Sequence, residues 1–402
     1  MPFRRFSKIA ILYIPFASLR ASISRTAEAA RDILVDIMAQ KSHHIDYALL
    51  AISSLLMAFG ILILSAVSAK ESFSNFGNTT HYLFRQILMG VIPGVALGFL
   101  AYKINLGFFK KFSWIFILLG FVLMMLVFLP GIGIKSFGAS RWLYFKSFSF
   151  QPSEFLKLFF AIYISAFLAN RFNRKKESFK SFFLPFFVVL GAIFVILNFQ
   201  KDLGTLFVIL IFGGMAYFVS GSPIKHIIFM MFILIALAFV SVTFFPYRID
   251  RLKVYFDPLS DPMNSGYQSN QSYIALGSGG IFGLGLGISW QNIPHAMSDS
   301  IFVAIGEQLG FLFCSLIVLF FLLFVWRAFV IAKRAQNNFS KILAICIGSW
   351  IGIQAIVNMS ALIGIMPLTG IPLPFISQGG THVMAELIAV GFLLNISKER
   401  RT

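Results

Sequence analysis

The sequence predicts an all-α polytopic membrane protein with about ten transmembrane helices. Hydrophobic residues make up 58% of the chain and charged residues only 12%, whereas soluble proteins carry about 25% charged residues. Apolar runs of about 20 residues recur along the chain, and each is long enough to cross roughly 30 Å of hydrocarbon as a helix. The alternating strands of a membrane β-barrel, each of about ten residues, are not found.

The predicted spans fall into groups separated by irregular segments rich in turn-forming residues. The two spans on either side of residue 201 can also be interpreted as one broken hairpin. In chain order the spans cover about 46–69, 82–102, 112–130, 153–170, 183–200, 203–221, 226–246, 300–325, 340–366 and 377–396. Three connecting segments, 131–152, 247–298 and 366–377, are too rich in Gly, Pro and polar residues to be simple connectors.

Basic residues are distributed unevenly between the two ends of the predicted spans. With the N-terminus placed inside, most of the 33 Lys and Arg residues fall in segments on that side. The positive-inside rule therefore predicts a cytoplasmic (inner) membrane protein with both termini in the cytoplasm and the three irregular segments outside. The net charge of +18 is then expected to meet anionic lipid headgroups. No nucleic-acid partner is predicted.

The chain is predicted to contain one integral domain, residues 46–396, with a large extracytoplasmic loop at about 247–298. A basic cytoplasmic extension, residues 1–45, precedes this domain, and a short cytoplasmic tail, 397–402, follows it. The extension is rich in Arg and Ser, which fits either a transit peptide or an amphipathic segment on the membrane surface. Cys314 and Cys346 both lie inside predicted spans, so we expect no disulfide bond.

All three irregular segments lie on the predicted outer side. Non-helical backbone near membrane depth is tolerated only where protein buries it or where it lines a wet cavity. We therefore expect a cavity that opens to the outside. Within the long loop, residues 267–276 combine apolar and polar residues in a pattern that fits a short interfacial helix.

Asp299 stands where the long polar loop ends and the apolar run 300–325 begins. Ionisable groups at such boundaries are energetically unfavourable and commonly serve transport or chemistry. A structural alternative is that Asp299 caps the following helix, whose N-terminus favours a carboxylate. Glu307, about two turns further on, would extend an acidic path inward along the same face.

Other charges lie at a comparable depth on the outer side. Glu154 and Lys157 are three residues apart, so they share a helix face and can form an ion pair that simply neutralises both charges. Asp202 can cap the helix that follows it, beside Lys201. With Arg141, these residues give a cationic cluster near one acid. That arrangement suits a hydroxyl nucleophile and an anionic leaving group.

Several other functions are not supported by the residues. The Gly-rich stretch 277–287 lacks the strand and the Gly-Lys-Ser/Thr ending of a nucleotide-binding loop. His295 and His382 are isolated from any metal-ligand spacing, so no metal site formed by protein ligands is predicted. A divalent cation bound with a substrate stays open as a cofactor. No Ser, His and Asp set has a spacing that supports a catalytic triad.

Six ordered motifs carry a resemblance to a known family. They are Gly138-Ala139-Ser140-Arg141-Trp142, Gln151-Pro152-Ser153-Glu154-x-x-Lys157, Asp202-Leu203-Gly204-Thr205, Pro246-Tyr247-Arg248-Ile249-x-Arg251, Ser265-Gly266-Tyr267-Gln268-x-x-Gln271-Ser272 and Pro372-Leu373-Pro374-Phe375-Ile376-Ser377-x-Gly379-Gly380. Over residues 46–396 they resemble the SEDS (shape, elongation, division, sporulation) family, also written FtsW/RodA/SpoVE. The Pro-Tyr-Arg-Ile-x-Arg and Ser-Arg-Trp sequences look more like the division branch than the elongation branch.

The resemblance implies the SEDS fold and an inverting peptidoglycan glycosyltransferase that polymerises lipid II for septal wall synthesis in cell division. Asp299 matches the family's essential acid and is the predicted catalytic residue. The implied partners are a class B penicillin-binding transpeptidase and other division proteins. The predicted substrate-binding residues are Arg141, Glu154, Lys157, Lys201, Asp202, Ser377, Gly379 and Gly380.

The sequence departs from the family pattern near the acid. His295, Met297 and Ser300 replace the family's Glu, His and Phe. Two other functions therefore stay open: a lipid II flippase, and a non-catalytic scaffold for a class B penicillin-binding protein. A role in cell elongation is the alternative process.

Overall fold

The computed structural model describes residues 45–136, 139–145, 148–170, 179–221, 228–229, 232, 246–257, 266–289 and 292–399. The described residues belong to one compact unit, 45–401; the predicted extension 1–45 lies almost wholly outside them. The helices are α2 (Tyr47–Phe76), α3 (His81–Gln86), α4 (Ile92–Lys103), α5 (Leu106–Lys111), α6 (Ser113–Leu126), α7 (Pro152–Ala169), α8 (Phe179–Phe199), α9 (Leu203–Val219), α11 (Pro246–Phe256), α12 (Tyr267–Ser278), α13 (Ile301–Arg334), α14 (Asn338–Leu362) and α15 (Gly380–Lys398), with a π-helical turn, η1 (Ile87–Val91), between α3 and α4.

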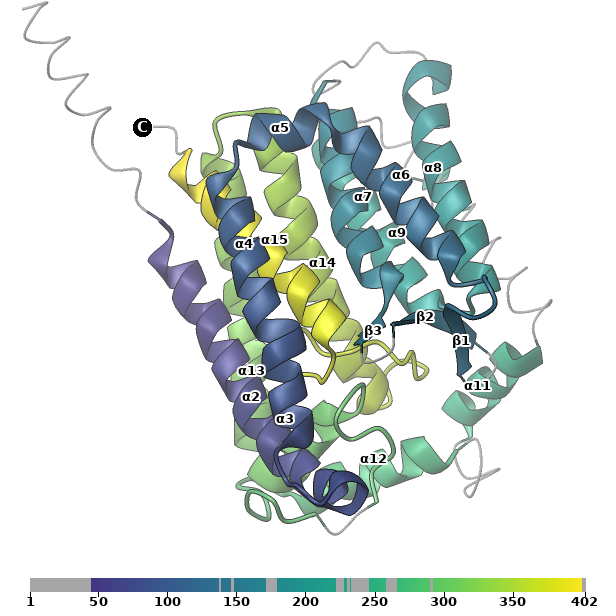
Figure 1. The fold of residues 1–402 in the computed structure, drawn as a ribbon, viewed down its shortest axis with the longest axis vertical. Helices are drawn as coiled ribbons and strands as arrows, with labels where there is room; N and C mark the ends of the chain where they lie inside the picture. Colours follow the sequence, from purple (N-terminus) through teal and green to yellow (C-terminus); the bar gives the residue numbers. More distant parts are fainter. Residues whose placement is uncertain are drawn as a thin grey trace, which may run out of the picture. The chain divides into compact units, whose positions relative to one another are not determined.

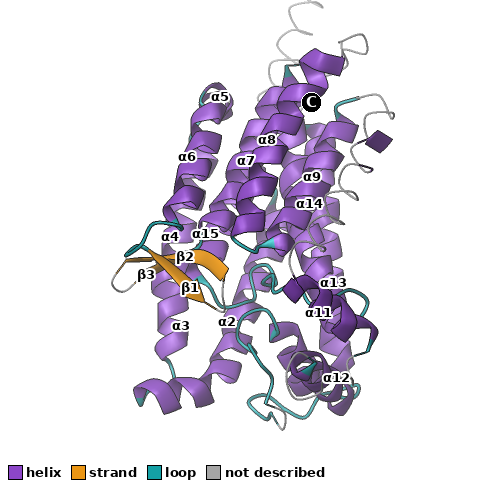
Figure 2. Cartoon of the chain, turned by 90° about the vertical axis from the view of Figure 1, so that its right-hand side faces the viewer, coloured by secondary structure: helices purple, strands orange, loops and turns teal. Residues whose placement is uncertain are grey.

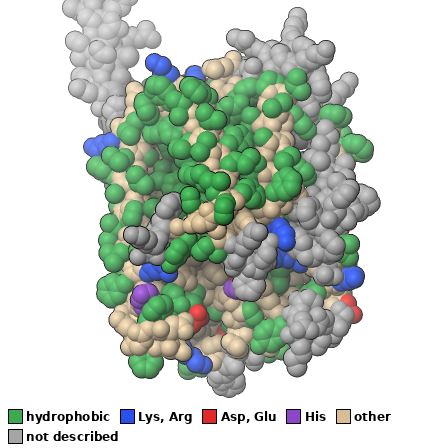
Figure 3. Space-filling view, turned by 45° about the vertical axis from the view of Figure 1, so that its right-hand side comes forward, with side chains coloured by type: hydrophobic (Ala, Val, Ile, Leu, Met, Phe, Trp, Pro, Cys, Tyr) green, Lys and Arg blue, Asp and Glu red, His purple; other side chains and the backbone are tan. Residues whose placement is uncertain are grey.

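The helices confirm the prediction of an integral, all-α membrane protein. Six are long and apolar enough to cross a membrane, and three shorter apolar helices lie at the predicted spans 112–130, 183–200 and 203–221. The predicted span 226–246 lies outside the described residues, apart from a few isolated positions. Figure 3 shows hydrophobic side chains covering the upper part of one face, with Asp, Glu and His side chains gathered below them. That arrangement is expected where lipid meets the span and water meets its end.

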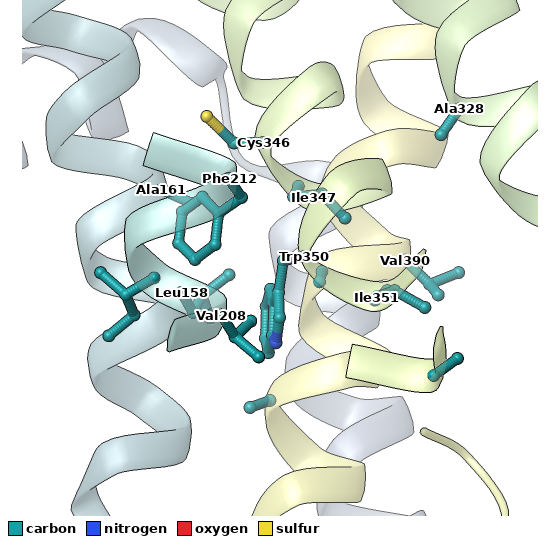
Figure 4. Close-up of a cluster of buried hydrophobic side chains, with 14 of the residues drawn as sticks. Leu158, Ala161, Val208, Phe212, Ala328, Cys346, Ile347, Trp350, Ile351 and Val390 are labelled. Carbon is teal, nitrogen blue, oxygen red and sulfur yellow. The ribbon is translucent and has the colours of Figure 1, made fainter. Parts of the chain in front are cut away.

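α14 lies at the centre of the helical packing, where it packs against α13, α7, α9 and α15 (Figure 1). Its Trp350 is fully buried and packs among Leu158 of α7, Val208 and Phe212 of α9 and Ile351 (Figure 4). A buried aromatic side chain of this size contributes more packing area than any aliphatic residue. The central helix is therefore fixed on several sides and provides a rigid platform for polar residues.

Small residues bring α4 and α15 into close contact. Gly90, Gly94 and Gly98 recur every four residues, so they share one helix face. A Cβ atom at Gly94 would lie 2.7 Å from the Leu387 side chain, and one at Gly98 would lie 2.6 Å from the Leu387 backbone oxygen. Glycines spaced in this way let membrane helices approach closely. The contact fixes α15, whose first residue is Gly380.

A small antiparallel sheet occupies the first irregular segment. The sequence pattern did not predict this sheet. Its strands are β1 (Gly133–Ser136), β2 (Ala139–Phe145) and β3 (Phe148–Phe150), in the order β1-β2-β3. Leu143 of β2 is buried and lies opposite Gly133 and Phe150. Figure 2 shows the sheet near the ends of α6 and α7. Its strands are too short to give a recognisable alternating pattern.

Contacts between distant segments confirm that the irregular segments meet on one side. Arg251 Nη1 donates a 2.9 Å hydrogen bond to the Leu368 oxygen, and Thr381 Oγ1 donates one of 3.3 Å to the Ser149 oxygen. At the opposite end, Lys398 Nζ donates a 2.9 Å bond to the Tyr102 oxygen. The first and last described helices also meet there, because the Asp46 amide donates to Ser397 Oγ at 3.1 Å.

Candidate functional site

Asp299 lies in a turn immediately before α13. The helix starts at Ile301, and its N-cap residue is Ser300, with no capping bond from a side chain. The helix-capping alternative for Asp299 is therefore wrong. The carboxylate is half-buried, and its Oδ1 accepts a 3.0 Å hydrogen bond from Ser298 Oγ. Among the described residues, it makes no ion pair.

Backbone hydrogen bonds define the turn that carries this acid. The amides of Ser298 and Ser300 both donate to the His295 oxygen, at 3.0 and 3.2 Å. His295 has a φ of 56°, which few residues other than glycine adopt. The turn therefore fixes the backbone on both sides of Asp299.

Two side chains fix the turn against residues 363–379, the non-helical stretch between α14 and α15 that contains the third irregular segment, 366–377. Asn358 Nδ2, from α14, donates to the backbone oxygens of Asp299 and Ile371, each at 2.7 Å. Ser377 Oγ donates to the Ser298 oxygen at 2.5 Å. The contacts therefore hold the backbone on both sides of the acid.

The segment 363–379 comes close to the carboxylate itself. Gly370 has a φ of 68°, and a Cβ atom there would lie 3.5 Å from Asp299 Oδ2. At its end, the Gly379 amide donates to Gln86 Oε1 at 2.8 Å, and Gln86 Nε2 donates to the Ser377 oxygen at 3.2 Å. The predicted residues Ser377 and Gly379 therefore lie in the structure that surrounds Asp299.

The predicted pair of Glu154 and Lys157 is confirmed. Lys157 Nζ lies 2.8 Å from Glu154 Oε2, and both side chains are buried. The same ammonium donates to Gln354 Oε1 at 2.6 Å and lies 5.1 Å from the centre of the Trp350 ring. Trp350 Nε1 donates to the same Gln354 oxygen at 2.8 Å. A buried charge requires such compensation.

Gln354 also links the ion pair to the segment that approaches Asp299. Its Nε2 donates to the Pro372 oxygen at 3.0 Å. Gln354 and Asn358 lie one helical turn apart on α14 and bind neighbouring carbonyl groups, those of Pro372 and Ile371. Neither residue was predicted from the sequence, although two amides four residues apart in an apolar span are an available signal.

Arg141, Lys201 and Asp202 meet where the sheet adjoins the turn between α8 and α9. Asp202 caps α9, because its Oδ1 accepts from the Thr205 amide at 3.3 Å and its Oδ2 from Thr205 Oγ1 at 2.9 Å. This confirms the capping alternative for Asp202. The Arg141 guanidinium donates to the Lys201 backbone oxygen, so the sheet is tied to this turn.

Glu386 is a further buried acid near the site. Its Oε2 accepts a 2.7 Å bond from the amide of Phe375, whose φ of 62° is unusual for a residue with a Cβ atom. Glu386 therefore stabilises the bend of the segment 363–379 from α15. The sequence marks this acid as buried but does not indicate its partner.

Glu307 lies beside a break in α13, and its part in an acidic path from Asp299 stays a prediction. Gly310 interrupts the helix with a φ of 77°, and the glycine-rich loop fills the gap. Its Leu284 amide donates to the Glu307 oxygen at 2.9 Å, and Ser289 Oγ donates to Glu307 Oε2 at 2.7 Å. The loop thus satisfies backbone groups that the break leaves unpaired.

The loop helices pack beside the segment 363–379. α12 confirms the helix predicted over 267–276, and Gln268 Nε2 on it donates to Ser300 Oγ at 3.0 Å. Tyr255 of α11 donates to the Ile365 oxygen at 2.9 Å. Burial and the nearby Tyr255 raise the pKa of Tyr273 above its ordinary value, so Tyr273 is a neutral hydrogen-bonding group at neutral pH.

The described residues contain no group of three or more His, Cys, Asp and Glu side chains placed to hold a metal ion.

The chain is similar to proteins of known family. The FTSW_RODA_SPOVE family, described as cell cycle proteins, matches residues 46–402. A relative from Thioalkalivibrio sulfidiphilus, named a probable peptidoglycan glycosyltransferase FtsW, is 32% identical and covers 92% of this chain and 94% of its own. Stage V sporulation protein E of Bacillus subtilis is 35% identical over 90% of this chain and 100% of its own.

Solved structures share the fold at lower identity. One, described as "Structural coordination of polymerization and crosslinking by a peptidoglycan synthase complex", has a TM-score of 0.73 and 23% identity, and the match covers 89% of this chain and 98% of that one. The rod shape determining protein RodA of Thermus thermophilus has a TM-score of 0.67 and 22% identity, with coverage of 89% and 98%. The protein is therefore a member of the FtsW/RodA/SpoVE family of cell cycle proteins.

Proposed function

We propose that this protein is a peptidoglycan glycosyltransferase that polymerises lipid II on the outer face of the cytoplasmic membrane during cell division. The names of its relatives support the activity and the process. The observation that carries the proposal is the state of Asp299. Its carboxylate neither caps α13 nor forms an ion pair among the described residues, while its backbone is fixed on both sides. A positioned carboxylate with spare acceptor capacity is suited to general-base catalysis.

In the proposed reaction, Asp299 accepts the proton of the GlcNAc 4-hydroxyl group of the acceptor. The electron pair of that oxygen forms the bond to the anomeric carbon of the donor MurNAc. The bond from this carbon to the pyrophosphate oxygen breaks, and undecaprenyl pyrophosphate departs with the electron pair. Attack opposite the leaving group inverts the configuration from α to β.

The leaving pyrophosphate requires positive charge nearby. Arg141 and Lys157 are the proposed contacts, together with Lys201, whose backbone oxygen binds Arg141, or a divalent cation brought by the substrate. Glu154 holds Lys157 in place. Asp202, Ser377, Gly379 and Gly380 complete the proposed substrate-binding residues by shaping the backbone around the cavity.

The proposed orientation places residues 46 and 397 in the cytoplasm and the irregular segments outside. The positive-inside rule supports it, as does the meeting of Asp46 with Ser397 at one end. A class B penicillin-binding transpeptidase is the proposed partner. The similar solved structure of a peptidoglycan synthase complex supports this choice, because its description joins polymerization with crosslinking.

The test is the reaction of the purified protein, reconstituted in vesicles, with lipid II in the presence and absence of a class B transpeptidase. Glycan polymer is the expected product. Translocation of lipid II without polymer would instead identify a flippase. If neither polymerisation nor translocation occurs, with or without the transpeptidase, and the transpeptidase still binds, the protein is a scaffold.

A further inference from the structure

Asn358 makes an unusual contact for a buried residue in the last turn and a half of the apolar helix α14. It is 2% exposed, and its Nδ2 donates to two backbone oxygens, of Asp299 and Ile371, that are 72 residues apart in sequence. The orientation of its amide is determined by this pair. A flipped amide would place Oδ1 against two carbonyl oxygens, which is repulsive.

The two polar atoms of the Asn358 side chain have different surroundings, which indicates that the residue positions other groups more than it stabilises the fold. Asn358 Oδ1 is buried and has no hydrogen-bond partner among the described residues, and a buried unpaired acceptor is unfavourable. The Nδ2 atom, in contrast, joins the backbone of the acid to the segment that places Gly370 beside Asp299 Oδ2. We infer that Asn358 is a positioning residue, which fixes Asp299 relative to residues 370–372.

The inference rests on the proposed function, since Asp299 is the base of the proposed reaction. The turn around His295 fixes the amides on either side of Asp299, but only within residues 295–300. Ser377 Oγ and the Gln378 amide tie the neighbouring oxygens of Ser298 and Met297 to a different segment. Among the described residues, Asn358 makes the bond to the backbone oxygen of Asp299 itself. Loss of such a contact moves a reacting group by a fraction of an ångström to about 1 Å, and a displacement of that size lowers rates by about 10- to 100-fold.

The chain contains a matched control for this role. Asn395 of α15 is also buried, and its Nδ2 donates to the backbone oxygens of Ala101 and Ile104 at 2.8 and 2.7 Å. The chemistry is the same, but the carbonyl groups lie near Tyr102 at the opposite end of the helices. A purely structural role predicts similar effects of substitution at both positions.

The experiment compares Asn358→Ala and Asn358→Asp with Asn395→Ala and Asn395→Asp in full-length protein in lipid nanodiscs. Hydrogen–deuterium exchange measures local order, and lipid II polymerisation measures kcat and KM. We expect the Asn358 variants to exchange faster in residues 296–300 and to lose about 10- to 100-fold in kcat, with KM within about threefold of wild type. The Asn395 variants should loosen residues near 101–107 and keep wild-type kcat.

Two results would overturn the inference: an unchanged exchange rate at residues 296–300 in the Asn358 variants, or equal losses of kcat at the two positions. If one Asn358 variant fails to fold, the other decides, with activity expressed per folded molecule from size-exclusion chromatography. Failure of both to fold, while the Asn395 variants fold, would assign Asn358 a structural role and also overturn it. If the Asn358 variants exchange faster at residues 296–300 but the wild-type protein itself forms no polymer, the result counts against the proposed function and not against the positioning role.

Discussion

Lys157 Nζ on α7 donates a 2.6 Å hydrogen bond to Gln354 Oε1 on α14, and both side chains are fully buried. The contact joins a buried ion pair to the helix that also anchors Asp299. Because Gln354 donates to the Pro372 oxygen, the ion pair and the segment beside the acid share one support. The ion pair of Glu154 and Lys157 is thereby linked to the segment beside Asp299.

Glu154→Gln should destabilise the protein more than the double substitution Glu154→Gln with Lys157→Met. The single substitution leaves a buried ammonium with neutral partners, and an uncompensated buried charge destabilises by about 3 kcal/mol. Thermal unfolding in detergent measures the difference. Equal unfolding temperatures for the single and double variants would show that the pair is not coupled as described. The double variant should still polymerise lipid II poorly, since the proposed contact to the pyrophosphate is lost.

Asp202→Ala should lower the free energy of unfolding by about 1 kcal/mol, since it removes the N-cap of α9. Asp202→Ser should recover most of this loss, because a serine hydroxyl can accept the bond from the Thr205 amide. Denaturation midpoints of the two variants check the prediction. A serine variant as unstable as the alanine variant would argue against capping as the main contribution.

Gly98→Ala should reduce stability, because its Cβ atom would lie 2.6 Å from the Leu387 backbone oxygen and α4 would be forced away from α15. Gly191 of α8 offers a matched control, with nothing within 4 Å of its Cβ position. Gly191→Ala should leave stability unchanged or raise it, since Ala favours a helix over Gly. Comparable losses in both variants would refute close packing as the reason for Gly98.

The helices were predictable because a membrane imposes length and composition on each span. The Glu154 and Lys157 pair followed from helical spacing, and the cap at Asp202 from its place before an apolar run. The sheet at 133–150 was not, since its strands are too short to give a recognisable alternating pattern. Nor could Asn358 and Gln354 be assigned roles, because their partners are backbone oxygens of a segment with no regular pattern.

Contacts with segments that have no regular pattern cannot be assigned from the sequence. For this reason the sequence around Asp299 does not by itself decide between capping and catalysis. Sequence places a carboxylate before a helix, but only coordinates show that Ser300 occupies the N-cap position. Glu386 is similar: the sequence places it inside the predicted span 377–396, whereas its bond to the Phe375 amide depends on a left-handed residue in another segment.

Polymerisation of lipid II by purified Asp299→Asn is the most direct test of Asp299 as the general base. The substitution keeps the shape of the side chain and the backbone contact with Asn358, so it should fold and bind lipid II like wild type while forming no glycan polymer. Glu71→Gln, at an exposed acid of α2, serves as the control for loss of one carboxylate and should polymerise normally. Polymer formation by Asp299→Asn at a rate near that of wild type would contradict the proposed mechanism.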